Sequence, residues 1–97
     1  MCMKVYFLRY SCYDTDYDEE EFIGVYTSKE LCEEVMYRHL HMKTICHSFF
    51  NETEIVEAET PLQRYEFIEN CHNTISYTFL YGIGYTITEY VVDDMNL

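Results

Sequence analysis

Clustered and alternating apolar residues open the chain and predict a hairpin of two strands. MKVYFLRY (Met3–Tyr10) is rich in β-branched and aromatic residues, which favour a strand. EFIGVY (Glu21–Tyr26) has the composition of a return strand, and Gly24 within it marks a bulge or a close approach of two backbones. Most residues between these strands are acidic, so we expect the hairpin to carry its carboxylates in a loop at its tip.

The pattern then changes to helical spacing. In TSKE, Thr27 can cap a helix while Glu30 reaches back to the N–H of the cap, which is the arrangement of a capping box. The spacing predicts a helix from about Ser28 to Met42. Its apolar face would consist of Leu31, Cys32, Val35, Met36 and Leu40.

The second half of the chain predicts another helix and another hairpin. Residues 43–59 show no clear period, although their apolar side chains need cover. TPLQ repeats the capping signal, with Thr60 as the cap and Pro61 at the first helical position, and predicts a helix that ends near Asn73. TISYTFLY (74–81) and YTITEYVV (85–92) are predicted strands, and the glycines of the GIG between them suit a tight turn.

Together these elements predict one α+β domain that spans residues 1–97. Their order, strand–strand–helix–helix–strand–strand, is typical of a four-stranded, mainly antiparallel sheet with two helices on one face. A chain of 97 residues is long enough to bury a modest core without disulfides or metals.

The charge balance narrows the range of partners. Eighteen Asp and Glu residues oppose six Lys and Arg, which gives a formal net charge of −12 at pH 7. Such a surface repels nucleic acid and anionic membranes and attracts basic proteins. No stretch is apolar enough to cross a membrane, the start lacks a secretion signal, and the five cysteines contain no C-x-x-C pair. We therefore expect a cytoplasmic protein with reduced thiols.

The acidic run DTDYDEEE (Asp14–Glu21) is the strongest candidate site, with six carboxylates in eight residues. Its opening resembles a calcium loop, but Glu19 and Val25 replace the glycine that makes the turn and the glutamate that closes the shell. A solvated hairpin tip is the simplest interpretation. The alternative is a partner-binding surface, because carboxylates and tyrosines can contact a basic groove through charge and ring stacking. The candidate partner-binding residues are Tyr10, Tyr13, Asp14, Asp16, Tyr17, Asp18, Glu19, Glu20 and Glu21.

No residues point to a metal, a cofactor or catalysis. The available zinc ligands lack the paired spacing that zinc sites use. They are His39, His41, Cys46, His47, Cys71 and His72. The chain also contains no nucleophile-turn or cysteine-hydrolase signature and no glycine-rich phosphate loop. We expect a protein that is not an enzyme and needs neither metal nor cofactor.

Three segments of the chain resemble a group of known sequences. Lys4–Leu8, Ile23–Met36 and Tyr85–Asp94 resemble small uncharacterised phage and bacterial proteins with a start like MKVYVV, a middle like VFSSKEKAEEY and an end like IEEYELD. The resemblance implies a small α+β fold and a phage or prophage setting, and it carries over no functional residue. Residues 43–81 depart from the pattern and are interpreted as an insertion.

Charge, acidic run and resemblance lead to one hypothesis about function. The chain would be a non-catalytic phage or prophage protein that inhibits a host protein with a basic groove, its carboxylates standing in for nucleic-acid phosphates. One example of such a host protein is a defence enzyme that handles nucleic acid. The chain would then act as an anti-CRISPR or anti-restriction protein. Two alternatives stay open: a homo-oligomer that sequesters a small signalling nucleotide, and a phage housekeeping protein whose charge serves solubility.

Two expectations about particular residues accompany this hypothesis. Tyr10, Tyr13 and Tyr17 should lie outside the core, because each is in or next to the acidic run. If that run makes no contact with the partner, the acids of the second half are the fallback: Glu52, Glu54, Glu57 and Glu59.

Overall fold

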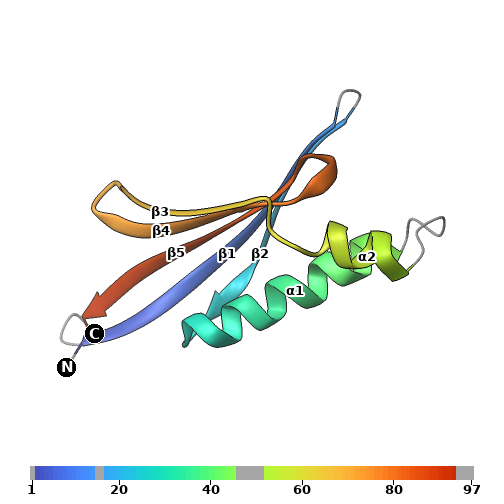
Figure 1. Cartoon of the computed structure of the whole chain (residues 1–97). Helices are drawn as coiled ribbons and strands as arrows, with labels where there is room; N and C mark the ends of the chain where they lie inside the picture. The colour runs from blue at the N-terminus through green and yellow to red at the C-terminus, as the bar shows by residue number, and fades with distance from the viewer. Residues whose placement is uncertain (1, 15–16, 46–51, 94–97) are drawn as a thin grey trace.

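The structure is a computed structural model that describes residues 2–14, 17–45 and 52–93 (Figure 1). Its elements are β1 (Cys2–Asp14), β2 (Tyr17–Tyr26), α1 (Lys29–Ile45), α2 (Glu52–Ala58), β3 (Gln63–Glu69), β4 (His72–Thr78) and β5 (Ile83–Asp93). The strands form one antiparallel sheet in the order β2-β1-β5-β4-β3. The predicted α+β class and antiparallel sheet are confirmed, but the described residues form five strands instead of the four expected.

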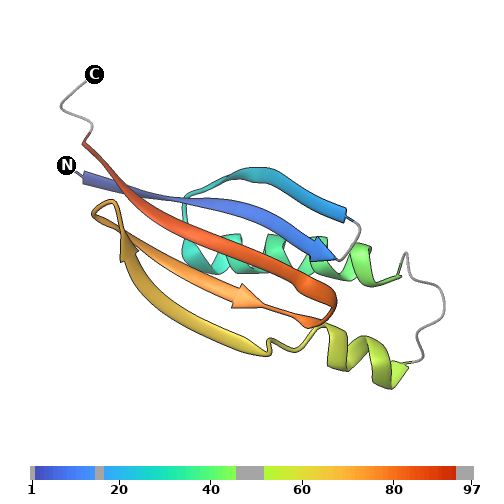
Figure 2. The same ribbon diagram turned by 90° about the horizontal axis from the view of Figure 1, so that it is seen from above.

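Both helices lie on one face of the sheet, which we call the inner face (Figures 1 and 2). The core fills the layer between this face and α1. Its most deeply buried side chains are Leu8, Cys32, Met36, Leu40, Phe79, Tyr85 and Ile87. Burial of one such side chain stabilises a fold by about 1.5–3 kcal/mol, so this layer is the main source of stability. Within the described ranges, no helix is long and apolar enough to span a membrane.

Helix α1 confirms the predicted helix but begins one residue later. The backbone N–H of Leu31 donates to Ser28 Oγ at 3.1 Å, so Ser28 caps the helix and the expected cap at Thr27 is wrong. Cys32 lies on the buried face, as the spacing predicts. Burial raises the pKa of its thiol to about 12, which makes it an unreactive core residue.

A β-bulge interrupts the pairing of β1 with β2. Leu8 lies opposite Gly24, but the next residue, Arg9, lies opposite Phe22, which leaves Ile23 as an extra residue in β2. The bulge expected near Gly24 is therefore confirmed. One extra residue reverses the alternation of side chains between the two faces beyond it.

The helix expected between Thr60 and Asn73 is wrong, because this segment forms β3 and the start of β4. The two strands pair without interruption from Gln63 opposite Thr78 to Glu69 opposite His72. Thr60 follows α2, where its hydroxyl donates to the Val56 carbonyl at 2.6 Å and closes that helix instead of beginning one. Cross-strand hydrogen bonds to β4 outweigh the helical spacing of the apolar residues in β3.

Asn70 and Cys71 form the two-residue turn between β3 and β4. Both have positive φ, 52° and 66° respectively. Hairpin turns with positive φ at both central residues prefer Asn followed by Gly, so Cys71 occupies a position that suits glycine.

We predict that Cys71→Gly stabilises the protein by about 1 kcal/mol, because glycine adopts positive φ without the steric cost of a side chain. Cys71→Ala keeps a Cβ atom and is the matched control, with little change expected. Urea unfolding of the three proteins measures both effects. Equal stability of the Gly and Ala variants would contradict this turn geometry.

Candidate functional site on the β1–β2 hairpin

The acidic run extends the two strands of the first hairpin instead of forming a loop. β1 continues to Asp14 and β2 begins at Tyr17, and these two residues pair. The pairing continues with Tyr13 opposite Asp18, which corrects the expected return strand at residues 21–26. Asp16 lies outside the described residues. The end of this hairpin extends past the connection between β4 and β5 (Figure 1).

Two acids of the run face helix α1. Beyond the bulge, Glu21 lies opposite Tyr10, whose ring belongs to the core, and Glu19 occurs two residues earlier on the same side. The Glu19 carboxylate lies 3.5 Å from Lys43 Nζ, and the Glu21 carboxylate lies 3.5 Å from His39 Nε2. Both acids therefore connect the edge strand β2 to α1.

His39 is the centre of this inner contact. Its Nδ1 atom lies 2.7 Å from the Tyr85 hydroxyl, and its ring lies 4.9 Å from the Tyr10 ring. These distances suit a neutral imidazole whose Nε2–H faces Glu21 and whose Nδ1 accepts from Tyr85. Burial lowers the pKa of His39, and the Glu21 carboxylate opposes this shift in part. Burial also raises the pKa of Tyr85 well above its usual range.

Tyr10 is a core residue, so the expectation that it lies outside the core is wrong. Only 3% of its surface is exposed, and Lys43 Nζ lies 5.0 Å from the centroid of its ring. The signal was present in β1, where every second residue from Tyr6 through Leu8 and Tyr10 to Cys12 faces the helices. This alternation continues past the point where the acidic run suggests a loop.

The opposite, outer face of the hairpin presents Tyr13, Glu20 and Phe22. The Tyr13 side chain is 60% exposed and that of Phe22 is 51% exposed. The Tyr13 hydroxyl donates to the Glu20 carboxylate at 3.0 Å. These residues line an open hollow of about 510 Å³, together with Arg9, Ser11 and Thr86. Tyr13, Glu20 and Phe22 are thus on the face of the sheet that the helices do not cover (Figure 1).

An aromatic row, made of Phe22, Phe7, Tyr90 and His72, crosses the outer face from β2 to β4. Neighbouring ring centroids lie 5.7, 4.5 and 4.1 Å apart in this order. A second hollow of about 450 Å³ lies along the row and shares Arg9 with the first. The sequence reasoning missed these residues, although Phe7 alternates with the buried Leu8 and could have been assigned to the other face.

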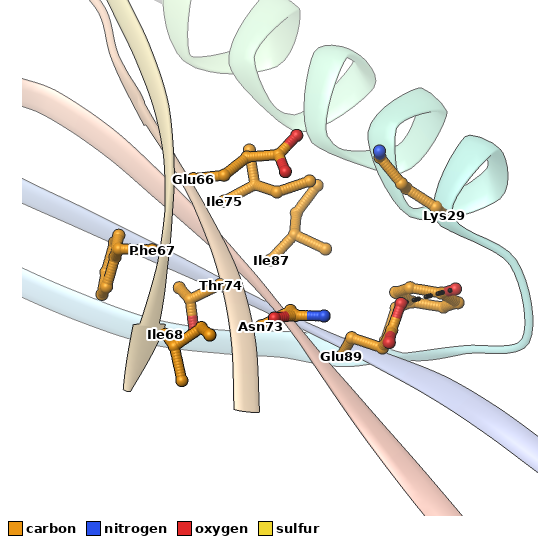
Figure 3. A pocket seen from close by; sticks show the side chains of 10 residues that line it. Lys29, Glu66, Phe67, Ile68, Asn73, Thr74, Ile75, Ile87 and Glu89 are labelled. Atoms are coloured by element: carbon orange, nitrogen blue, oxygen red, sulfur yellow. Dashed lines mark hydrogen bonds between the residues drawn. The ribbon is translucent and has the colours of Figure 1, made fainter. Parts of the chain in front are cut away.

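A cavity of about 270 Å³ lies on the inner face, between the start of α1 and the strands β3, β4 and β5 (Figure 3). The charged and amide side chains around it come from four elements: Lys29, Glu66, Asn73 and Glu89. Its apolar lining includes Ile75 and Ile87. The carboxylates already have partners, since Glu89 accepts from Tyr6 at 3.2 Å and Glu66 from Arg64 at 2.9 Å.

A family model described as Domain of unknown function (DUF7336) matches residues 3–69. The chain belongs to this family. The matched range covers nearly all of β1 and then β2, α1, α2 and β3, so the likeness expected at Tyr85–Asp94 lies outside it. No curated protein and no solved structure matches the chain.

The histidines within the described residues, His39, His41 and His72, have different surroundings. His41 contacts the Glu59 carboxylate and joins α1 to the end of α2, whereas the His72 ring packs at a tilt against the Tyr90 ring on the outer face. Among the residues that the structure describes, no three His, Cys, Asp or Glu side chains gather closely enough to hold a metal ion. Cys46 and His47 lie outside the described residues.

We predict that His39 makes the stability of the DUF7336 chain depend on pH. Its pKa is lower in the folded than in the unfolded state, so the folded chain disfavours the protonated ring. The stability that His39 contributes is complete above its ordinary pKa, about 6.5, and declines as the pH falls below it. His39→Gln cannot titrate, so the unfolding free energy of wild type minus variant should shrink between pH 7.5 and about 5.5.

Urea unfolding of both proteins at each pH measures this difference. A difference that stays constant, or that grows as the pH falls, would contradict the buried neutral imidazole.

Proposed function

We propose that this DUF7336 chain is a non-catalytic phage or prophage protein that binds and inhibits a host protein. The partner has a basic groove, as a nucleic-acid-handling defence enzyme does, and the inhibition is of the anti-CRISPR or anti-restriction type. The binding surface is the outer face of the β1–β2 hairpin. One observation carries this choice: two exposed rings, Tyr13 and Phe22, lie beside the Glu20 carboxylate in an uncovered hollow.

The hollow suits a lysine or arginine side chain of the partner. A cation over an aromatic ring gains about 0.5–2 kcal/mol, depending on how far the contact excludes water. Glu20 adds a full negative charge, and the hydrogen bond from Tyr13 holds its carboxylate next to the ring. Arg9 also lines the hollow, and its positive charge would repel a cationic side chain of the partner.

The charge of the whole chain favours the same class of partner. Among the described residues, the side chains of Lys4, Arg38, Lys43 and Arg64 lie within ion-pair distance of a Glu of the chain itself. The basic side chains are thus largely taken up by internal contacts, and the excess of acids dominates the surface. Such a field accelerates association with a basic groove, and salt screens it.

The contacts of the acidic run change which of its residues are proposed to bind the partner. Glu19 and Glu21 contact α1 and support the fold, and Tyr10 is in the core. The proposed contact therefore consists of Glu20 and Tyr13, together with the remaining candidate residues of the acidic run: Asp14, Asp16, Tyr17 and Asp18. The fallback acids in and just after α2 remain part of the proposal: Glu54 and Glu57 are exposed, and Glu59 contacts His41.

A small-molecule-binding protein is the second candidate, and the cavity of Figure 3 favours it. Lys29 and Asn73 offer hydrogen-bond donors for an anionic group beside the apolar Ile75 and Ile87. The volume of about 270 Å³ lies just below the usual range of roughly 300–1,000 Å³ for ligand sites. A nucleotide would fill the cavity with one part and extend out of it with the rest.

The proposed inhibitor function is tested by comparing variants of Glu20 and Tyr13, on the outer face, with a variant of Glu19, on the inner face. A host lysate passed over the immobilised chain should yield one basic protein in stoichiometric amount, and its association rate is then measured. Glu20→Gln combined with Tyr13→Ala should slow association about tenfold, because it removes a charge and a ring at the contact. Glu19→Gln is the matched control: it removes the same charge from the inner face and should leave the rate within about twofold.

Equal rates for the outer-face and inner-face variants would contradict this surface. A partner lost only with substitutions at Glu54 and Glu57 would move the contact to α2.

The second candidate predicts a bound small molecule. Native mass spectrometry of the purified chain should then show an added mass that Lys29→Ala removes and Arg38→Ala, on the exposed side of α1, retains. Absence of an added mass, or the same loss in both variants, would contradict a ligand in this cavity.

A further inference from the structure

The two edges of the sheet differ in how they are protected. β2 and β3 are the edge strands, and the outer side of an edge strand presents N–H and C=O groups that can pair with another chain. β2 carries a bulge and three consecutive glutamates, Glu19 to Glu21, both of which hinder pairing with a copy of itself. β3 pairs regularly with β4 over its whole length and contains neither Lys nor Pro. β3 is therefore the open edge.

Apolar side chains are unusually exposed along β3. Ile68 is 73% exposed, and Leu62, which precedes the strand and donates its backbone N–H to the Thr78 carbonyl, is 62% exposed. Tyr65 lies on the other face and is 46% exposed. Figure 3 shows the alternation, with Glu66 toward the cavity and Phe67 on the opposite side of the strand. Exposed apolar residues on an open edge favour strand addition.

We infer that β3 pairs with β3 of a second copy of the chain, antiparallel and with the two-fold axis at Tyr65. A two-fold axis perpendicular to the sheet joins the two inner faces into one continuous face. It must pass through a single residue position, because residues opposite each other in an antiparallel pair lie on the same face.

The side chains of β3 select the position of this axis. An axis at Tyr65 places Arg64 opposite Glu66 of the second copy and Leu62 opposite Ile68 of the second copy, each twice by symmetry. An axis at Glu66 would oppose two like charges, which is destabilising in a cross-strand pair. An axis at Phe67 would place Glu66 opposite Ile68. Only the axis at Tyr65 pairs charge with charge and apolar with apolar.

Arg64 is already positioned for this contact. Its guanidinium contacts Glu66 at 2.9 Å within the chain, and its Nε donates to the Tyr77 hydroxyl at 3.2 Å. These contacts hold the side chain along the strand, next to the position that Glu66 of the second copy would take. Edge pairing of a seven-residue strand forms a small interface, so the dimer is weak and its population depends on concentration.

The test uses two variants that cannot pair with themselves. Sedimentation velocity from low micromolar to near-millimolar concentration should show the wild-type chain passing from monomer to dimer. Arg64→Glu alone and Glu66→Arg alone should each raise the dissociation constant at least about tenfold, because like charges then face each other across the axis. An equimolar mixture of the two variants should form a dimer again, since each chain then meets the opposite charge.

Both variants lose the contact between Arg64 and Glu66 within the chain, so recovery in the mixture reports pairing between chains. Arg38→Glu, with the same change of charge on α1, is the control and should dimerise like the wild type. If Arg64→Glu fails to fold by circular dichroism, Ile68→Lys replaces it, because that side chain is exposed in the monomer and should also prevent pairing. A chain that stays monomeric, a dimer insensitive to these variants, or a mixture that does not recover would overturn the inference.

Discussion

The bulge at Ile23 determines which side chains of β2 contact helix α1. Before it, Tyr26 and Gly24 share the inner face with Tyr6 and Leu8 of β1. A regular strand would continue this alternation and turn Phe22 and Glu20 toward the helix. The extra residue shifts the alternation, so that Glu21 and Glu19 face α1 instead.

This shift explains how a strongly acidic strand can pack on a helix. His39 and Lys43 lie one turn apart on α1, and each meets one of the two inward carboxylates. The Tyr10 and Tyr85 rings shield the contact from one side, which strengthens its electrostatic and hydrogen-bonding interactions. Phe22 is released to the outer face, where it joins the aromatic row. The bulge thus determines which acids of β2 contact helix α1 and which face away from it.

Much of the fold could be predicted from the sequence. The first two strands, helix α1 and the last strand have periodic patterns that agree with the contacts they make. The segment after Thr60 could not be assigned from its pattern, because Leu62, Tyr65 and Ile68 fit a helical spacing and also lie in or beside a strand. The pairing partner β4 decides between the two, and local spacing contains no information about a strand farther along the chain.

The candidate site was predictable only in part. The acidic run identifies the hairpin, but acidic residues are poor strand formers, so its continuation as paired strands was missed. Gly24 signalled a bulge, yet which acids face the helix depends on the position of the extra residue opposite β1. That position follows from the fit of Ile23 against the core, and it requires the assembled sheet.

Contacts between aromatic rings, measured by nuclear Overhauser effects, test this division of the hairpin most directly. The structure predicts contacts from the His39 ring to the rings of Tyr10 and Tyr85, whose centroids lie 4.9 and 5.6 Å away. It also predicts a contact between Phe22 and Phe7, with centroids 5.7 Å apart, and no contact between Phe22 and α1. Contacts from Phe22 to side chains of α1, with none from His39 to Tyr10, would show that the alternation of β2 is reversed and would contradict the account.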